Sequence, residues 1–566
     1  MPLVVLGLSG ALTHDPSAAI YIDGQLIAAA EEERFTRQKH AKHAMPLHAS
    51  RYCLKEAGLK PKDVDVVAFP FAKTSIFGKA RWHYARRYWY APERAIDALF
   101  NGNRHYRRNV KKVRELVSQL GINWPDIQFD AVEHHIAHAS SAYHLSGFEG
   151  KVAILGIDGK GEYATTFFGY GEEGRIHKIK EFYDPDSLGQ LYASFTEYLG
   201  FEMLDGEFKV MGMAPYAKEN YYKTIYTKVF KDIQKFKDLA LIHNKRPKNL
   251  YGYLKENLRH ERFDNIAGAV QYYVEITVRE LLKRIYKKYK IKNFFFSGGI
   301  SMNVKMHNFL IKDKNVTKIH NAPSGSDESL SIGACYYLNR KNQSFPLKNL
   351  SLGIPVAEKN SEIKKIIAKN FKRNFKINYS IKPKYIAKLI SKNEIIAIAD
   401  GREEFGARAL GNRSIIANPS NPDNVKQINE FIKNRDFWMP FAPSVLDNCS
   451  KEYLIKSEKA IARHMAITFQ TTQKGYSKMI AGCHDADKTA RAQIVTRKMN
   501  KDYHELISAF KKITDCGALL NTSFNLHGFP VVRNLKEAYE VLNKSDLDGL
   551  ISKNYIFLKK KVRIIN

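Results

Sequence analysis

Long apolar runs are absent from this sequence. Stretches such as Ile395 to Ala399 and Phe294 to Phe296 fall far short of the roughly 18 to 20 residues that cross a bilayer. The apolar stretch Met1 to Leu12 has no basic residue ahead of it and runs into His14, which is unlike a signal peptide. We therefore expect a cytoplasmic protein with no membrane partner.

Cysteine is scarce, with five residues in 566 and no C-x-x-C spacing among them. This pattern is typical of reduced thiols and argues against a cysteine zinc site. A chain of this length exceeds what one core accommodates, and its hydrophobic content of 44% is ordinary for a folded protein. Two or more globular domains are expected.

Acidic residues are also few, 58 Asp and Glu against 90 Lys and Arg, which gives a net charge of +32. Such an excess indicates an anionic partner, either a nucleic acid or anionic small substrates. Most of the lysines are spread through the chain, as in residues 359–392. The densest basic and aromatic segment is Lys79 to Lys112, which could bind a polyanion, present a solvated basic helical face or dock a partner.

Two copies of one strand pattern indicate the fold. Residues 3–8, 17–23 and 25–30 are predicted strands with a small-residue loop after the first, and residues 151–157, 163–170 and 176–183 repeat the plan around the loop Asp158 to Glu162. The repeat predicts a pseudo-twofold α/β domain with a ligand between its halves. Actin-like and hexokinase-like proteins are built this way, so the likeness implies a nucleotide in the cleft.

Two histidines, His134 and His138, follow a predicted strand and open a predicted helix. Four residues apart, they share one helical face and can reach a single metal ion; the alternative is a helix N-terminus whose histidines bond to backbone carbonyls. Asp158 ends a strand and is a candidate third ligand. Asp327 begins a later helix, where it is either an N-cap or a metal carboxylate.

Glycine-rich loops offer backbone N–H groups for phosphates. The first is Asp158 to Glu162, and the second is Ser297 to Asn303, between a buried strand and a helix. Lys209 lies near small residues and could meet a phosphate or could be a solvated turn lysine. The candidate nucleotide residues are Gly159, Gly161, Lys209, Gly298, Gly299 and Asn303.

A second cationic set lies beyond residue 360. A predicted strand, Glu394 to Ala399, enters the stretch Asp400 to Ser414, and several fixed cations could bind a small phosphate through bidentate hydrogen bonds. Surface salt bridges are the alternative for each arginine. The cations are Arg408, Arg413, Lys433, Arg435 and Arg491.

Taken in order, these motifs resemble the NodU/CmcH-type O-carbamoyltransferase family, which includes tobramycin carbamoyltransferase. The shared motifs are H-H-x-x-H-A, D-G-x-G-E, M-G-M-A-P-Y, S-G-G-I-S-M-N, P-x-G-x-D, E-F-G-x-R-A-L-G-N-R-S and N-T-S-F-N, and they cover nearly the whole chain. The resemblance implies an actin-like domain over residues 1–340, a linker over 341–360 and a YrdC-like α/β domain over 361–566. Ala407, Asp487-Lys488 and His527 to Phe529 depart from the family pattern.

The resemblance also implies a reaction. Carbamoyl phosphate loses its phosphate, ATP activates the carbamate as carbamoyl adenylate, and a hydroxyl of a small, sugar-containing acceptor takes the carbamoyl group. One divalent metal, Fe²⁺ in the family, is expected on His134, His138, Asp158 and Asp327. The residues expected to bind carbamoyl phosphate are Arg408, Arg413, Lys433, Arg435, Arg491, Asn521 and Ser523.

Two residues are expected to act in catalysis, His14 and Lys209. His14 can position or deprotonate the acceptor because imidazole titrates near neutral pH. The aromatic segment 79–112 is expected either to form a wall beside the mouth of the cleft or to pack its rings in a core. A homodimer is compatible with the sequence. The rival hypothesis is a tRNA-modifying or nucleic-acid-binding relative with the same fold, although the second domain makes a nucleic-acid partner the weaker expectation.

Overall fold

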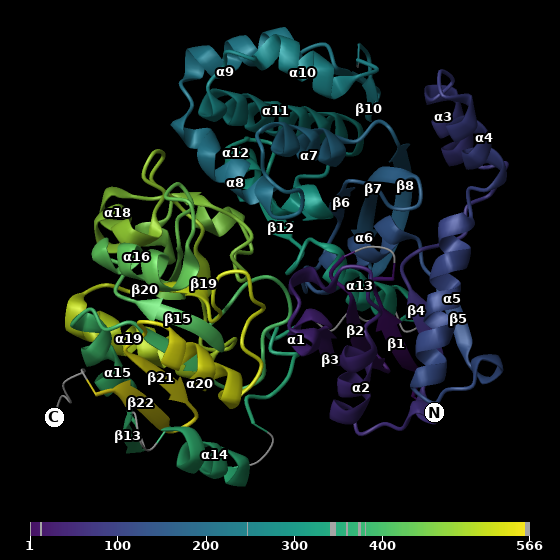
Figure 1. Cartoon of the computed structure of the whole chain (residues 1–566). Helices are drawn as coiled ribbons and strands as arrows, with labels where there is room; N and C mark the ends of the chain where they lie inside the picture. Colours follow the sequence, from purple (N-terminus) through teal and green to yellow (C-terminus); the bar gives the residue numbers. More distant parts are fainter. Residues whose placement is uncertain are drawn as a thin grey trace.

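The computed structural model describes residues 2–11, 14–245, 247–339, 347–357, 360–371, 375–379 and 381–560. Three sheets dominate it (Figure 1). Two five-stranded sheets come from the first 321 residues, and an eight-stranded sheet comes from residues 375–559. No described helix is both long enough and apolar enough to cross a membrane.

The two five-stranded sheets share one plan, with orders β3-β2-β1-β4-β5 and β8-β7-β6-β11-β12. In each, the first strand pairs antiparallel with the next strand in sequence and parallel with the fourth of the set. The first sheet contains β1 (Val4–Leu8), β2 (Ser17–Ile22), β3 (Gln25–Glu31), β4 (Val66–Phe69) and β5 (Gln128–Ala131). The second contains β6 (Val152–Ile157), β7 (Ala164–Glu172), β8 (Arg175–Tyr183), β11 (Asn293–Ser297) and β12 (Lys318–Asn321). The predicted duplicated, actin-like α/β domain is confirmed.

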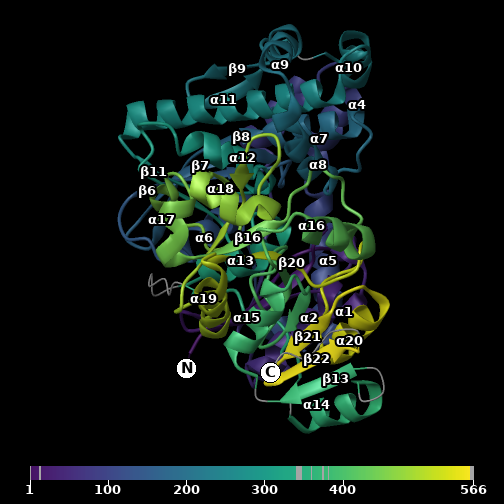
Figure 2. The ribbon, with the colours of Figure 1, turned by 90° about the vertical axis from the view of Figure 1, so that its left-hand side faces the viewer.

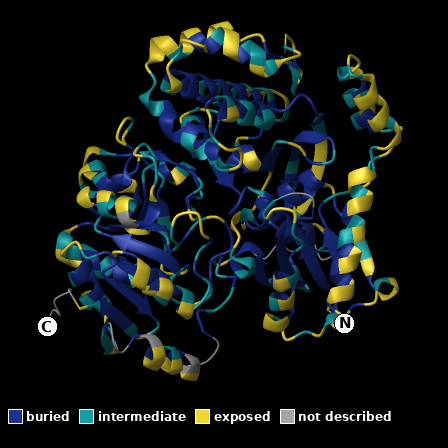
Figure 3. Cartoon of the chain, in the orientation of Figure 1, coloured by how far each residue is buried: buried dark blue, intermediate teal, exposed yellow. Residues whose placement is uncertain are grey.

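Two buried helices, α6 (His134–His144) and α13 (Leu330–Tyr337), lie between these sheets. They cross so closely that a Cβ on Gly333 would stand 1.9 Å from the carbonyl oxygen of Ala137. Gly7 of β1 allows α13 an equally close approach, because its Cβ would meet the carbonyl oxygen of Ser331 at 2.1 Å. β1, β6, α6 and nearly all of β2 and α13 are buried (Figure 3), whereas the edge strands β5 and β8 are mostly intermediate or exposed. This packing fixes the start of α6 beside the end of β6.

The C-terminal α/β domain has a different, mixed sheet with the order β13-β22-β21-β14-β15-β20-β16-β19. Its strands are β13 (Phe375–Tyr379), β14 (Ile396–Ala399), β15 (Arg413–Ala417), β16 (Ala442–Leu446), β19 (Gln493–Val495), β20 (Ala518–Ser523), β21 (Gly549–Ser552) and β22 (Tyr555–Lys559). Two-stranded ribbons are formed by β9 (Gln234–Lys237) with β10 (Ala240–His243) and by β17 (Phe469–Gln470) with β18 (Thr489–Ala490). An α/β domain in this part of the chain was predicted.

The other α-helices cover these sheets or extend from them. In the first part they are α1 (Glu33–Thr36), α2 (Leu47–Glu56), α3 (Lys79–Arg87), α4 (Pro92–Phe100), α5 (Arg104–Gln119), α7 (Leu188–Tyr198), α8 (Gly206–Met213), α9 (Glu219–Ile225), α10 (Leu250–Leu258), α11 (Phe263–Tyr289) and α12 (Val304–Leu310). In the second they are α14 (Asn360–Ile366), α15 (Pro383–Ser391), α16 (Asp423–Ile428), α17 (Ser450–Tyr453), α18 (Gln473–Met479), α19 (Lys501–Thr514) and α20 (Leu535–Lys544).

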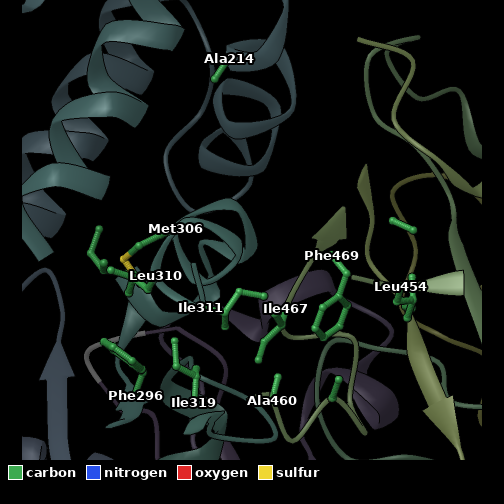
Figure 4. Packing of buried hydrophobic residues seen from close by; sticks show 14 of the residues in the cluster. Ala214, Phe296, Met306, Leu310, Ile311, Ile319, Leu454, Ala460, Ile467 and Phe469 are labelled. Atoms are coloured by element: carbon green, nitrogen blue, oxygen red, sulfur yellow. The ribbon is translucent and has the colours of Figure 1, made fainter. Parts of the chain in front are cut away.

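One hydrophobic core continues from the first part of the chain into the second. Phe296, Met306 and Ile319 belong to the same buried cluster as Ile467 and Phe469 (Figure 4). A backbone bridge joins Ile319 to Ala460. In the view turned by 90°, the C-terminal domain lies in front of the strands of the second sheet (Figure 2). The two parts of the chain therefore pack against each other through a shared hydrophobic core.

Candidate active site

Four side chains from three separate elements meet at the start of α6. His134 and His138 lie one turn apart on α6, Asp158 directly follows β6, and Asp327 begins the turn before α13. Asp158 Oδ2 lies 3.0 Å from His134 Nε2 and 3.6 Å from His138 Nε2, while Asp327 Oδ1 lies 4.0 Å and 3.7 Å from the same two nitrogens. One ligand atom from each of the four residues falls within 4.8 Å of all the others.

The donor set suits a divalent cation. Two imidazoles and two carboxylates are ligands that Zn²⁺, Fe²⁺ and similar ions accept. Both ring nitrogens of His138 are buried and have no hydrogen-bond partner among the described residues, which is a costly state for a polar group that binds nothing. Burial would raise the pKa of Asp158, but His134 and His138 hold it well below its usual range. The residues present therefore fit the expected ion.

The two aspartates of this cluster open onto a cavity of about 470 Å³ that both parts of the chain line. The first part contributes Asp158, Asp327, His14 and the backbone around Gly299, and the second contributes Ser523 with nearby residues. Other lining residues are Gly159, Lys160, Glu207, Phe208, Met302, Asn303, Ala407, Asn525, Phe529, Pro530 and Val531. A ligand in this space would contact both domains at once.

His14 belongs to a short hydrogen-bonded chain at the cavity wall. Its Nδ1 lies 2.7 Å from Asp15 Oδ2, and the other oxygen of Asp15 lies 2.7 Å from His40 Nδ1. Burial favours the neutral ring, but the hydrogen bond to Asp15 and the charges of Asp327 and Asp158 raise the pKa of His14 to about 9. At neutral pH this imidazole is therefore protonated and suited to donating a hydrogen bond to an anion.

The two glycine-rich loops converge on Asp158. The N–H of Gly299 donates to Asp158 Oδ1 at 3.0 Å, and Gly298 has a φ of +81° with no room for a Cβ beside Ile157. Gly159, Gly299 and Asn303 line the cavity. Gly161 instead packs against His134, and the Asn303 side chain caps α12 while bonding to Gln271.

Lys209 lies elsewhere. It is on α8, and its Nζ forms an ion pair with Asp436 Oδ2 of the C-terminal domain at 2.9 Å. Its neighbours Glu207 and Phe208 point to the cavity, whereas Lys209 is not among the lining residues. Successive side chains on a helix point in different directions, so Lys209 faces away from the cavity although Phe208 before it lines the wall.

A cluster of arginines lies beside this wall in the C-terminal domain, and the charge of Glu328 acts on one of them, Arg408. Arg408, Arg435 and Arg491 form no ion pair with any described carboxylate within 4.0 Å, and the guanidinium of Arg408 lies 5.0 Å from the ring centre of Phe208. Burial, and then repulsion from Arg408 and Arg435, holds the pKa of Arg491 well below its usual range. Burial and the charge of Arg408 likewise lower the pKa of Arg435 to about 10. Cations held this way are prepared for an anion.

Lys433 anchors one side of this cation cluster. Its buried Nζ donates to the side chain of Asn525 at 2.6 Å and to the hydroxyl of Ser523 at 3.2 Å. Asn521 donates to the carbonyl of Ala409 and to Ser444, while its own Oδ1 is buried without a partner. These residues of β20 and its loop connect the cluster to the cavity.

Arg413 is placed differently from the other cations. On β15, it donates to the main-chain carbonyls of Asp400 at 2.6 Å and Ile354 at 3.1 Å, and to three more. Its charged neighbours are Glu403, Glu404 and Asp400, not the other arginines. The sequence pattern grouped Arg413 with the phosphate-binding cations, but both of its terminal nitrogens are engaged by main-chain carbonyls of the protein.

Comparisons with known proteins show the family to which the chain belongs. Residues 4–336 match the model for the carbamoyltransferase N-terminus and residues 387–559 match the model for the carbamoyltransferase C-terminus. The chain belongs to the carbamoyltransferase family. An uncharacterized protein from Synechocystis sp. is 30% identical to this carbamoyltransferase over 602 residues, which cover 98% of the chain and 96% of that protein.

The chain is also similar to a nodulation protein and, in fold, to a component of a dehydratase. Nodulation protein NolNO from Sinorhizobium fredii is 29% identical over 583 residues, covering 99% of this carbamoyltransferase and 83% of that protein. Among solved structures, component A of the (R)-2-hydroxyglutaryl-CoA dehydratase from Acidaminococcus fermentans matches 60% of this chain and 99% of its own, at 13% identity and a TM-score of 0.34.

Some residues of the site were not predicted. Asp15 and His40 escaped notice, although Asp15 is adjacent to His14 in the motif His14-Asp15-Pro16-Ser17. Arg34 was also missed. It is buried and reaches Glu31 at 3.0 Å and Glu403 of the other domain at 3.1 Å, and only its place in the acidic run Glu31 to Glu33 could have suggested this role.

The basic and aromatic segment does not form the cavity wall. None of residues 79–112, all of which the structure describes, lines the cavity. The nearest link is Lys160, which lines the cavity and has its Nζ 5.1 Å from the ring centre of Tyr84. Trp82 and Trp89 are 56% and 73% exposed, so they are not core residues either.

Proposed function

We propose that this carbamoyltransferase takes the carbamoyl group of carbamoyl phosphate, activates it with ATP as carbamoyl adenylate and transfers it to a hydroxyl of a small acceptor. Hydrolysis of the donor releases phosphate and carbamate. Carbamate and ATP then give carbamoyl adenylate and pyrophosphate, and attack by the acceptor oxygen releases AMP. The mixed anhydride is needed because a carbamate anion is a poor electrophile.

The observation that carries this proposal is one cavity lined by both domains, with a buried histidine and aspartate cluster on one side and, beside the other, arginines that form no ion pair with a described carboxylate. A phosphate held by Arg408, Arg435 and Arg491 would receive charge-assisted hydrogen bonds in place of solvent. Because the cations adjoin the cavity through Phe208, a labile carbamate would travel only a short way before activation. Enclosure protects such an intermediate from water.

In the first domain, the backbone N–H of Gly159 can donate to a phosphate oxygen of the nucleotide, and Asn303 lines the same cavity, while the N–H of Gly299 is already engaged by Asp158. His134, His138, Asp158 and Asp327 would hold a divalent metal, which when bound supplies a Lewis acid for the carbonyl. Iron is the ion that the family resemblance implies. Lys209, through Asp436, would connect α8 to the second domain and so act by position.

His14 would position the acceptor or the departing phosphate group. Asp15 holds one edge of its imidazole, and His40 holds Asp15 in turn. A ring fixed at one nitrogen presents the other in a defined direction, and a protonated ring stabilises an anion. The acceptor would be an alcohol on a polar, sugar-containing molecule, as the family resemblance implies.

Product analysis tests this function. The enzyme is incubated with ATP and carbamoyl phosphate, with and without a panel of sugar-containing alcohols, and nucleotides, pyrophosphate and phosphate are quantified beside acceptor mass. We expect AMP and pyrophosphate, and one acceptor that gains the mass of a carbamoyl group. Exclusive formation of ADP would contradict the adenylate route.

A matched pair of variants locates the donor site. Arg408→Gln should reduce phosphate release from carbamoyl phosphate by about 10²-fold or more, because each donor to a buried anion contributes strongly. Arg497→Gln removes an exposed arginine that pairs with Glu505 and should leave the rate unchanged. Equal rates of phosphate release in the two variants would show that Arg408 does not bind carbamoyl phosphate.

A further inference from the structure

An arm formed by residues 77–112 has its helices α3 and α4 at the upper right of Figure 1, beyond the edge strand β8 of the second sheet. Exposed large hydrophobic side chains concentrate on it, and Figure 3 shows much of its surface as exposed or intermediate. They are Phe77 at 91%, Trp82 at 56%, Trp89 at 73%, Tyr90 at 43%, Ile96 at 56% and Phe100 at 70% exposure. Such a concentration on a soluble surface marks an interaction site.

The arm is also strongly basic. Within residues 77–112 the only acidic side chains are Glu93 and Asp97. The basic ones are Lys79, Arg81, Arg86, Arg87, Arg94, Arg104, Arg107, Arg108, Lys111 and Lys112. Most of these are exposed, and Lys248 from another element lies 5.7 Å from the ring of Trp89. The partner of the arm should therefore carry negative charge.

The arm is built into the fold. His83 and Arg87 of α3 lie 3.0 Å and 3.1 Å from the carboxylate of buried Asp186, and Arg81 donates to the main-chain carbonyls of Thr74 and Leu99. These contacts fix one side of α3 against the second sheet. On the other side, Trp82, Arg86 and Trp89 follow one another at helical spacing toward solvent.

We propose that the arm docks this enzyme on the surface of an anionic lipid bilayer. Trp82, Trp89, Ile96 and Phe100 would enter the interfacial region, and the arginines and lysines would contact lipid phosphates. The sequence predicted no membrane partner because it has no spanning run, but surface docking needs none. Lys160 links the arm to the cavity, so a bilayer-bound enzyme could meet acceptors held at that surface.

The other anionic partners fit less well. Nucleic acids bind cations and aromatic rings that stack on bases, but the exposed Ile96 and Phe100 would make few favourable contacts with a phosphodiester backbone. A second copy of the chain would bring another arm of the same sign to a protein of net charge +32. A bilayer rewards the apolar and the basic side chains together.

Vesicle binding of the full chain tests the proposal. Sedimentation with vesicles of phosphatidylcholine mixed with phosphatidylglycerol is compared with vesicles of phosphatidylcholine alone. We expect binding to the anionic vesicles, lost at high salt, and lowered about tenfold or more by Trp82→Ala with Trp89→Ala and by Arg86→Glu with Arg108→Glu. Tyr379→Ala with Phe263→Ala and Lys231→Glu with Lys235→Glu are controls, since they change exposed residues elsewhere, and they should bind like the unmodified chain.

Fluorescence adds a readout at the arm itself. The chain has four tryptophans, and Trp82 and Trp89 are exposed, so insertion should shift the emission to shorter wavelength. Trp82→Phe with Trp89→Phe should bind vesicles but lose the shift. Equal binding by arm and control variants, binding to duplex DNA without binding to vesicles, or a dimer that the arm substitutions dissociate would each overturn the proposal. None of these outcomes depends on the transfer reaction.

Discussion

At the scale of single residues, the site contains groups whose placement is costly without a ligand. His138 is fully buried, neither of its ring nitrogens has a hydrogen bond within the part of the chain that the structure describes, and Asp158 is close enough to hold the ring charged. Burial favours the neutral ring, yet the nearby Asp158 and Asp327 raise the pKa of His138 to about 9. A cation bound by both carboxylates would replace this imidazolium, so binding and protonation should compete.

Replacing His138 by Ala should lower metal affinity by about 100-fold or more, because a direct ligand counts for at least as much as the outer partners of a metal site. His144→Ala is a matched control, since His144 is another buried histidine of α6 but stacks on Tyr336 away from the carboxylates. Metal content by mass spectrometry and the melting temperature are measured for both. Equal metal content in the two variants would show that His138 serves packing only.

Substitutions of Arg491 and Arg413 should have opposite effects on the free energy of unfolding. Arg491 lies near other cations and has no described acidic partner, so Arg491→Met should raise the free energy of unfolding by about 0.5–2 kcal/mol while phosphate release is lost. Arg413→Met should instead lower it by about 3 kcal/mol or more, because five main-chain carbonyls lose their donor. Urea unfolding measures both. If Arg491→Met destabilised as much as Arg413→Met, the cation cluster would be structural.

At the scale of elements, the close crossing of α6 and α13 sets the distance between the histidines and Asp327. Gly333→Ala would place a methyl group 1.9 Å from the carbonyl of Ala137, so the helices must separate. We expect a loss of about 1–3 kcal/mol in unfolding free energy together with weaker metal binding. Thermal unfolding and metal titration check this. A melting temperature and affinity both unchanged would mean that the crossing adjusts without moving the site.

The elements themselves were largely predictable. The repeated strand pattern placed β1, β2 and β3 within a residue of the predicted 3–8, 17–23 and 25–30, and β6, β7 and β8 within two residues of the predicted 151–157, 163–170 and 176–183. The four metal-site residues are also brought together as expected. The engagement of Arg413 and Lys209 could not be foreseen, because hydrogen bonds to distant carbonyls and an ion pair with Asp436 depend on tertiary packing that local pattern does not encode.

At the scale of the whole molecule, function and stability depend on the same interface. Arg34 is buried among Glu31, Glu33 and Glu403, and Gly406 donates its N–H to Glu31 across the two parts. The cavity lies at this junction, and the hydrophobic core crosses it nearby. Separation of the two parts would expose apolar surface of that core to water and lower stability. The cavity should therefore persist as long as the fold does.

This shared core predicts one unfolding transition for the whole chain. Separate domains of this size would ordinarily unfold independently, but Phe296 and Ile319 pack in one cluster with Ile467 and Phe469, so loss of either part exposes apolar surface of the other. Trp124 reports on the first part and Trp438 on the second, once the exposed Trp82 and Trp89 are replaced by Phe. Variants that keep a single reporter should give urea midpoints that coincide with each other and with circular dichroism. Phe469→Ala should lower the free energy of unfolding by about 3–5 kcal/mol, since it opens a cavity in the common core. Both urea midpoints should therefore move together to a lower concentration. Separation of the two midpoints, in the parent or in this variant, would show that the two parts are independent units that only touch.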